Sequence, residues 1–85
     1  MIIVQTSKPG RDAKMVRAYL PANPGGVRKS VGVSASTTGN VSWAIIKCAA
    51  KAFQKLNGGD VDEIQTRCKI EPHPQADTWF VNLTA

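Results

Sequence analysis

The chain has 85 residues and a formal net charge of +5, and 42% of its residues are hydrophobic. This length favours a single domain, residues 1–85, with a core of modest size. The opening MIIVQTSKPG lacks the basic and long apolar regions of a signal peptide, and no apolar run approaches the ~20 residues that span a bilayer, so we expect a soluble cytoplasmic protein with no membrane partner.

Three short strands are predicted in the first half of the chain. Met1–Gln5 is a run of β-type residues, and Met15–Leu20 alternates between apolar and polar positions. Val27–Ser36 alternates in the same way, with Val31, Val33 and Ala35 on one side. Turn signals separate the three strands, at Pro9-Gly10 and at Asn23-Pro24-Gly25-Gly26.

The longest periodic segment is NVSWAIIKCAAKAFQKLNGG, residues 40–59. Asn40 is a good helix N-cap, and Gly58 and Gly59 favour the left-handed conformation that ends a helix. One stripe of this helix is apolar and rich in small residues: Val41, Ile45, Cys48, Ala49, Ala52 and Leu56. We expect the stripe to lie close to a sheet, with Ile45, Ala49 and Ala52 buried against Val31, Val33, Ile64 and Cys68.

Two further strands are predicted after the helix, Glu63–Glu71 and Thr78–Leu83, joined by a connector over Pro72–Asp77. The order β-β-β-α-β-β predicts an α+β fold, a two-layer sandwich with a mostly antiparallel four- to five-stranded sheet and one helix on one face. Cys48 and Cys68 both fall on apolar sides of their elements. They are interpreted as two buried thiols in preference to a disulfide.

The sequence contains no motif for catalysis, a cofactor or a metal. His73, the sole histidine, lies in a loop between two prolines and has no partner motif. The acidic residues Asp60, Asp62 and Glu63 offer oxygen ligands for Mg²⁺, but acids beside a Gly-Gly turn are more commonly solvated. We therefore expect a non-enzymatic protein that binds a partner.

The positive charge is concentrated before residue 58, where nine Lys or Arg residues accompany one acid. The outer face of the predicted helix carries a row in steps of four: Trp43, Lys47, Lys51 and Lys55. A tryptophan among lysines favours a protein interface with an acidic partner. The simpler alternative is a solvated charged face, with Trp43 folded back into the core.

The second sheet face offers a different binding surface. Four basic residues interleaved with two aromatic residues are predicted there: Arg17, Tyr19, Arg28, Arg67, Lys69 and Phe80. Such a face can stack unpaired bases while its cations follow a phosphate backbone. A basic nucleic-acid-binding module is therefore the alternative function.

In layout and size the whole chain resembles the small single-domain anti-CRISPR proteins of phages. The resemblance rests on an N-terminal hairpin region, one alanine-rich helix and a C-terminal strand pair ending in TWFVNL. It implies an inhibitor that binds a CRISPR-Cas protein complex in the cytoplasm of a bacterial host. Many members are acidic and occupy basic nucleic-acid channels, whereas this chain is basic. The difference points instead to an acidic patch on a Cas subunit or nuclease, or to a mode of binding assisted by nucleic acid.

Overall fold

The computed structural model describes residues 1–7, 14–22, 26–37 and 39–84. The predicted turn at Pro9-Gly10 and residues 23–25 of the second predicted turn lie outside this part of the chain. The elements in chain order are β1 (Ile2–Ser7), β2 (Lys14–Tyr19), β3 (Ser30–Thr37), α1 (Val41–Asn57), α2 (Val61–Arg67), β4 (Cys68–Pro72) and β5 (Thr78–Leu83).

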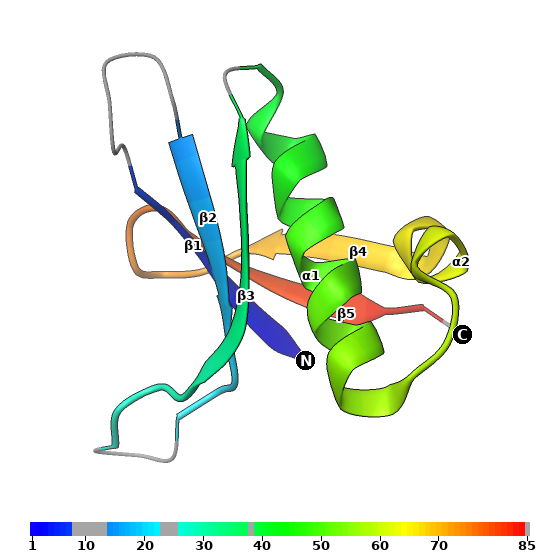
Figure 1. Ribbon diagram of the computed structural model, residues 1–85. Helices are drawn as coiled ribbons and strands as arrows, with labels where there is room; N and C mark the ends of the chain where they lie inside the picture. Colours follow the sequence, from blue (N-terminus) through cyan, green and yellow to red (C-terminus); the bar gives the residue numbers. More distant parts are fainter. Residues whose placement is uncertain (8–13, 23–25, 38, 85) are drawn as a thin grey trace.

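The five strands form one antiparallel sheet in the order β3-β2-β1-β5-β4, and α1 covers one of its faces (Figure 1). The predicted α+β sandwich is therefore confirmed, with one helix more than expected. β1 lies in the middle of the sheet. It pairs with β2 in the first hairpin and with β5 of the C-terminal hairpin, and so joins the two hairpins. The two edges of the sheet are β3 and β4.

The ends of α1 follow the predicted capping signals. The Asn40 side chain accepts a hydrogen bond from the Trp43 amide at 3.3 Å, which satisfies one of the free donors of the first turn. At the other end, Gly58 has φ of 78° and donates its amide to Gln54 at 2.7 Å. Glycine reaches this backbone conformation without the steric cost that a side chain would add.

The core lies between the inner face of α1 and the sheet. Ile45, Ala49 and Ala52 are all buried, as expected, and they pack in one cluster with Val31 and Ile64. The sheet contributes Ile2, Val4, Val16, Ala18 and Val81 to the same cluster. Because the helix face consists largely of alanines and Cys48, its backbone lies close to the strands. Leu56, which the pattern placed on this stripe, is 46% exposed near the helix end.

The predicted strand over Glu63–Glu71 is wrong in its first half, because residues 61–67 form the short helix α2. The Asp60 carboxylate caps this helix by accepting from the Asp62 amide at 3.0 Å. Asp62 and Glu63 lie in the first turn, where the helix dipole favours negative charge. These capping interactions prevail over the apolar alternation, since Ile64 alone needs burial and Thr66 is exposed.

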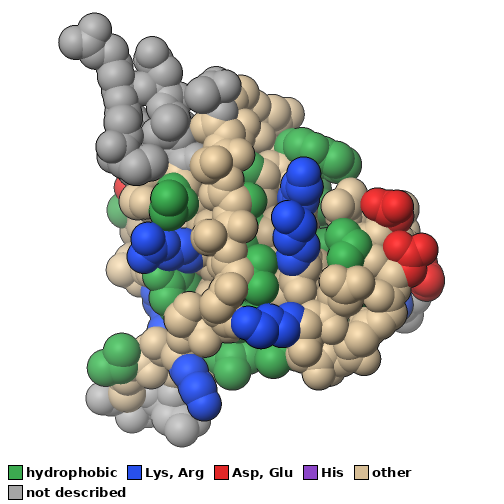
Figure 2. Space-filling view, in the orientation of Figure 1, with side chains coloured by type: hydrophobic (Ala, Val, Ile, Leu, Met, Phe, Trp, Pro, Cys, Tyr) green, Lys and Arg blue, Asp and Glu red, His purple; other side chains and the backbone are tan. Residues whose placement is uncertain are grey.

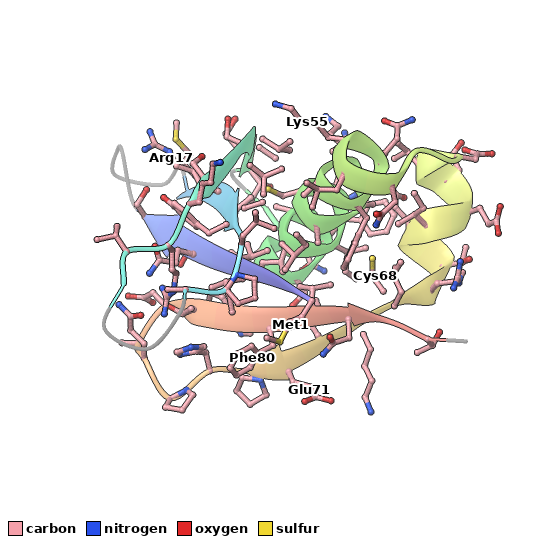
Figure 3. The ribbon with its side chains drawn as sticks, turned by 90° about the horizontal axis from the view of Figure 1, so that it is seen from below. Met1, Arg17, Lys55, Cys68, Glu71 and Phe80 are labelled. Carbon is pink, nitrogen blue, oxygen red and sulfur yellow. The ribbon has the colours of Figure 1, made fainter. Side chains whose placement is uncertain are left out.

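The sheet face away from α1 is partly covered as well. The register pairs Ile3 with both Tyr19 and Phe80, so these three side chains form a row across β2, β1 and β5. Ile3 is only 2% exposed, although it lies opposite the helix side. In Figure 3, Phe80 and Glu71 point away from α1, while Cys68 lies on the covered side of β4.

Replacing Ala49 by arginine should abolish the cooperative fold. Ala49 is completely buried between α1 and the sheet, so the substitution forces an unpaired charge into a space that holds a methyl group. The matched control is Ala22→Arg on an exposed residue, which should change the free energy of unfolding by less than about 0.5 kcal/mol. An Ala49→Arg protein with the wild-type melting temperature would contradict this packing.

Stability should fall as pH rises above about 9. Burial raises the pKa of the Cys48 thiol from 9.0 to about 11, and the nearby Lys51 ammonium opposes the shift only in part. Between these values the unfolded chain loses the proton and the folded chain keeps it, so unfolding becomes more favourable. In urea titrations from about pH 8 to about pH 11, Cys48→Ala should lose less stability than wild type. Equal losses would show that the thiol is not shielded.

Candidate functional site

Trp43 and the lysines of α1 form one exposed row, here called the helix row: Trp43, Lys47, Lys51 and Lys55. All four side chains are exposed, and Trp43 is 56% exposed despite its size. Successive members lie about 6 Å apart along the helix axis, since each step is four residues. Figure 2 shows Lys and Arg side chains aligned over α1, with acidic side chains gathered over α2.

No carboxylate of the described residues forms an ion pair with the lysines of the helix row. Within the described residues, the ion pair that forms joins Lys69 and Glu71 at 3.5 Å, on a different element. Asp60 caps α2, and Asp62 and Glu63 lie in the first turn of the same helix. The positive charge of the helix row is therefore available to an external partner.

The C-terminal part of the helix row lies near the edge strand β3. Lys55 extends over it, and its Nζ lies 2.8 Å from the position that a Cβ on Gly32 would occupy. Lys51 is adjacent to Cys48, whose thiol is within 3.7 Å of the Val33 carbonyl oxygen. The exposed surface thus combines a row of cations on α1 with the free edge of a strand beside it.

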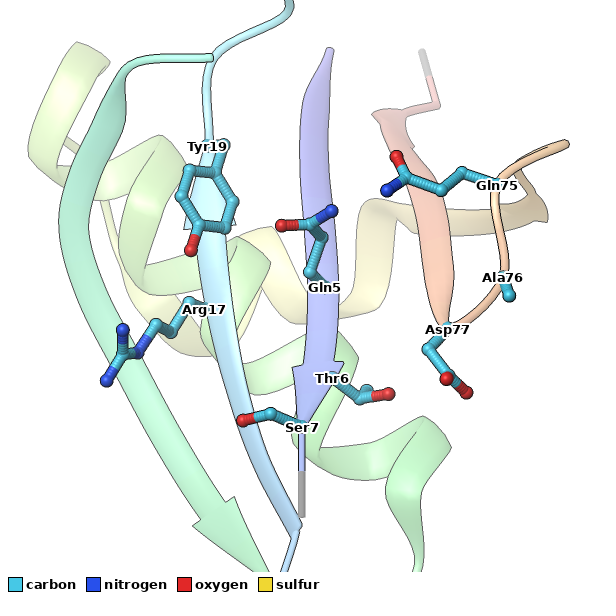
Figure 4. A pocket seen from close by; sticks show the side chains of 8 residues that line it. All are labelled: Gln5, Thr6, Ser7, Arg17, Tyr19, Gln75, Ala76 and Asp77. Carbon is cyan, nitrogen blue, oxygen red and sulfur yellow. The ribbon is translucent and has the colours of Figure 1, made fainter. Parts of the chain in front are cut away.

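The predicted nucleic-acid face is only partly assembled. Arg17 and Tyr19 extend from β2 on the face away from α1 and line a hollow of about 320 Å³ (Figure 4). The remainder of its lining is polar apart from Ala76, and comes from β1 and from the loop before β5: Gln5, Thr6, Ser7, Gln75, Ala76 and Asp77. Arg17 is exposed and Tyr19 is half-buried, so both are accessible to a ligand.

Other predicted members of that face are engaged with neighbouring residues. Arg28 donates from Nη2 to Gln75 at 2.8 Å and lies 3.4 Å from His73 Nε2. His73 covers Phe80, with the two ring centroids 4.5 Å apart. The structure therefore gives His73 a packing role that its position in a proline-flanked loop did not indicate.

Lys69 and Arg67 complete the six predicted residues. Lys69 extends from β4 on the open face and pairs with Glu71. Arg67 belongs to α2 instead of a strand, and its Nε donates to the Thr84 carbonyl at 3.0 Å. Its expected place on the sheet face is therefore wrong, because the chain enters the sheet only at Cys68.

The part of the chain that the structure describes contains no cluster of His, Cys, Asp and Glu suited to a metal ion. None of its helices is long and apolar enough to cross a membrane. No family model, curated protein or solved structure matches the chain. The candidate function therefore rests on the geometry of the two surfaces.

The free edge of β3 is the feature of this site that the sequence did not reveal. The segment SVGVSAST is recognisable as a strand, but its place at the edge follows from pairing between distant segments.

Acrylamide should quench Trp43 strongly in the free protein. The test uses the Trp79→Phe variant, which leaves Trp43 as the sole indole. A side chain that is 56% exposed should be accessible to a small neutral quencher. The Trp43→Phe variant supplies the matched comparison, since half-buried Trp79 should be quenched less. Equal quenching of the two indoles would mean that Trp43 is shielded.

Proposed function

We propose that this protein is a non-catalytic binding protein that docks on an acidic surface of a larger protein complex through Trp43, Lys47, Lys51 and Lys55. The observation that carries the proposal is an indole 56% exposed at one end of three lysines that form no ion pair among the described residues. An exposed indole leaves apolar surface in contact with water, which is unfavourable. A partner that buries this surface removes that free-energy cost.

The two kinds of side chain have different tasks in such a contact. Tryptophan supplies a large area with few rotatable bonds, and it is enriched at the centres of interfaces. The lysines increase the rate of encounter with a negative surface and fix the orientation of the complex. The +5 net charge of the whole chain acts in the same direction.

The specific partner that we propose is a Cas subunit or nuclease with an acidic patch, so that the protein acts as an inhibitor of a bacterial defence complex. Support for this choice comes from the layout and size of the chain, in which an N-terminal hairpin, one long alanine-rich helix and a C-terminal strand pair resemble those of the small anti-CRISPR proteins. The basic outer face of α1 is the surface that would meet the patch.

Binding of single-stranded nucleic acid is the second candidate, and it is favoured by Arg17 and Tyr19 at the hollow of the open sheet face. Glu71 offsets the charge of Lys69 on this face, and the Arg28 guanidinium already donates to Gln75. It therefore ranks behind the helix row.

Paired charge reversals separate the two candidates. Lys47→Glu with Lys51→Glu alters the helix row, and Arg17→Glu with Lys69→Glu alters the sheet face. Each pair lowers the net charge from +5 to +1, so overall charge is matched. All four residues are exposed, so both variants should keep the wild-type melting temperature.

The expected result is that purified Cas effector complexes bind wild-type protein and the sheet-face variant, and lose at least tenfold in affinity for the helix-row variant. A loss of this size corresponds to about 1.4 kcal/mol, which two desolvated charge contacts supply. Full binding by the helix-row variant, with binding of a single-stranded oligonucleotide lost only in the sheet-face variant, would replace the proposal by the second candidate.

A further inference from the structure

β3 is an edge strand whose composition leaves it open to pairing. Edge strands are usually blunted by charged residues, prolines or covering elements. At the opposite edge, β4 carries Lys69, Glu71 and Pro72 over five residues. The eight residues of β3 include none of these, and four of them are Ser or Thr.

The ladder pattern identifies which backbone groups of β3 are free. The Thr6 amide donates to Asp77 at 2.9 Å, so the backbone groups of Thr6 point toward β5 and those of Gln5 toward β2. Gln5 pairs with Arg17, and the next residue, Val16, therefore points its backbone toward β3, where it pairs with Ala35. By the same alternation, the amides and carbonyls of Ser34 and Ser36 point outward.

One end of β3 is less suited to pairing than the other. Gly32 has φ of 79°, the register with β2 shifts between Arg17 and Tyr19, and Lys55 lies over the same glycine. Bulges of this kind interrupt a ladder. The segment available to a partner strand is therefore Val33–Thr37, the C-terminal part of β3, which runs beside α1 (Figure 1).

The helix row and an added strand have matching repeats. The lysines of the row recur about every 6 Å along α1, since each helical residue rises 1.5 Å. Side chains on one face of a strand recur about every 6.6–6.8 Å. Over the length of three lysines these repeats stay nearly in phase, so alternate side chains of one strand can meet successive lysines.

We propose that the partner of the helix row docks by adding an extended acidic segment to β3 as a sixth strand. Its main chain bonds to the outward groups of Ser34 and Ser36, and carboxylates at every second position face Lys47, Lys51 and Lys55. The inference rests on the proposed function and specifies how the partner is recognised. A second copy of this chain does not fit, because pairing two β3 edges would bring two lysine rows together.

The direct probe is a synthetic peptide of about eight residues with glutamate at every second position and threonine or valine between. A peptide of the same composition with its glutamates contiguous is the matched control. Binding is followed by Trp43 fluorescence in the Trp79→Phe protein. The alternating peptide should bind about tenfold more tightly than the control at low salt, because only it places a carboxylate at each lysine.

N-methylation of the peptide backbone tests the strand pairing without altering the protein. Methylating the amides on one alternate set should reduce affinity about tenfold or more, while methylating the other set should change it little, since only one set faces β3. Binding should also slow hydrogen exchange of the Ser34 and Ser36 amides. Equal effects of the two methylated sets, with no protection of these amides, would overturn the proposal.

A variant of the protein supplies the complementary test on a Cas complex or other partner bound through the helix row. Ser34→Pro removes an outward donor but leaves the Val16–Ala35 pairing, and Ser34→Ala keeps the donor. Binding should be lost with proline and kept with alanine. If the Lys47→Glu with Lys51→Glu variant loses binding but a folded Ser34→Pro protein binds fully, strand addition is overturned and the proposed function stands. Full binding by the lysine variant would overturn the proposed function itself.

Discussion

The close contact between the small-residue face of α1 and the sheet is the constraint on which the other features depend. Cys48, Ala49 and Ala52 are completely buried, and protein interiors tolerate little unfilled or excess volume at such points. The contact fixes which side of the helix is covered, and hence which side is exposed. Because Cys48 lies against β2 and β3, with its thiol near the carbonyls of Val16 and Val33, the neighbouring Lys51 and Lys55 are held near the edge of the sheet.

The two edges of the sheet differ in composition, and its two faces differ in the residues that cover them. The β4 edge carries charge and a proline, and α2 precedes it directly. The face away from α1 is closed over Ile3 by Tyr19 and Phe80, with His73 against Phe80 and Arg28 bonded to Gln75. The surface formed by β3 and the helix row has neither protection among the described residues. It joins free backbone groups to lysines that form no ion pair there.

Local signals in the sequence were sufficient for much of the fold. Asn40 and Gly58 marked the two ends of α1, and the alternation of Val31, Val33 and Ala35 identified β3. Ile64, Thr66 and Cys68 alternate equally well, yet the Asp60 cap and the acids after it stabilise a helix there instead. Strand order depends on contacts between distant segments, so the edge position of β3 was not predictable. The helix row was predictable because i to i+4 spacing is a property of the helix alone.

Residue-specific hydrogen exchange of the free protein tests the central claim, that α1 and β3 present an open strand edge beside exposed lysines. The Ala35 amide faces β2 and should exchange slowly, close to the rate of global unfolding. The Ser34 and Ser36 amides on either side of it should exchange faster by a factor of about a hundred or more, because they point away from β2 and no described residue accepts a hydrogen bond from them. Slow exchange at all three residues would contradict the account, since it would mean that the edge of β3 is already paired.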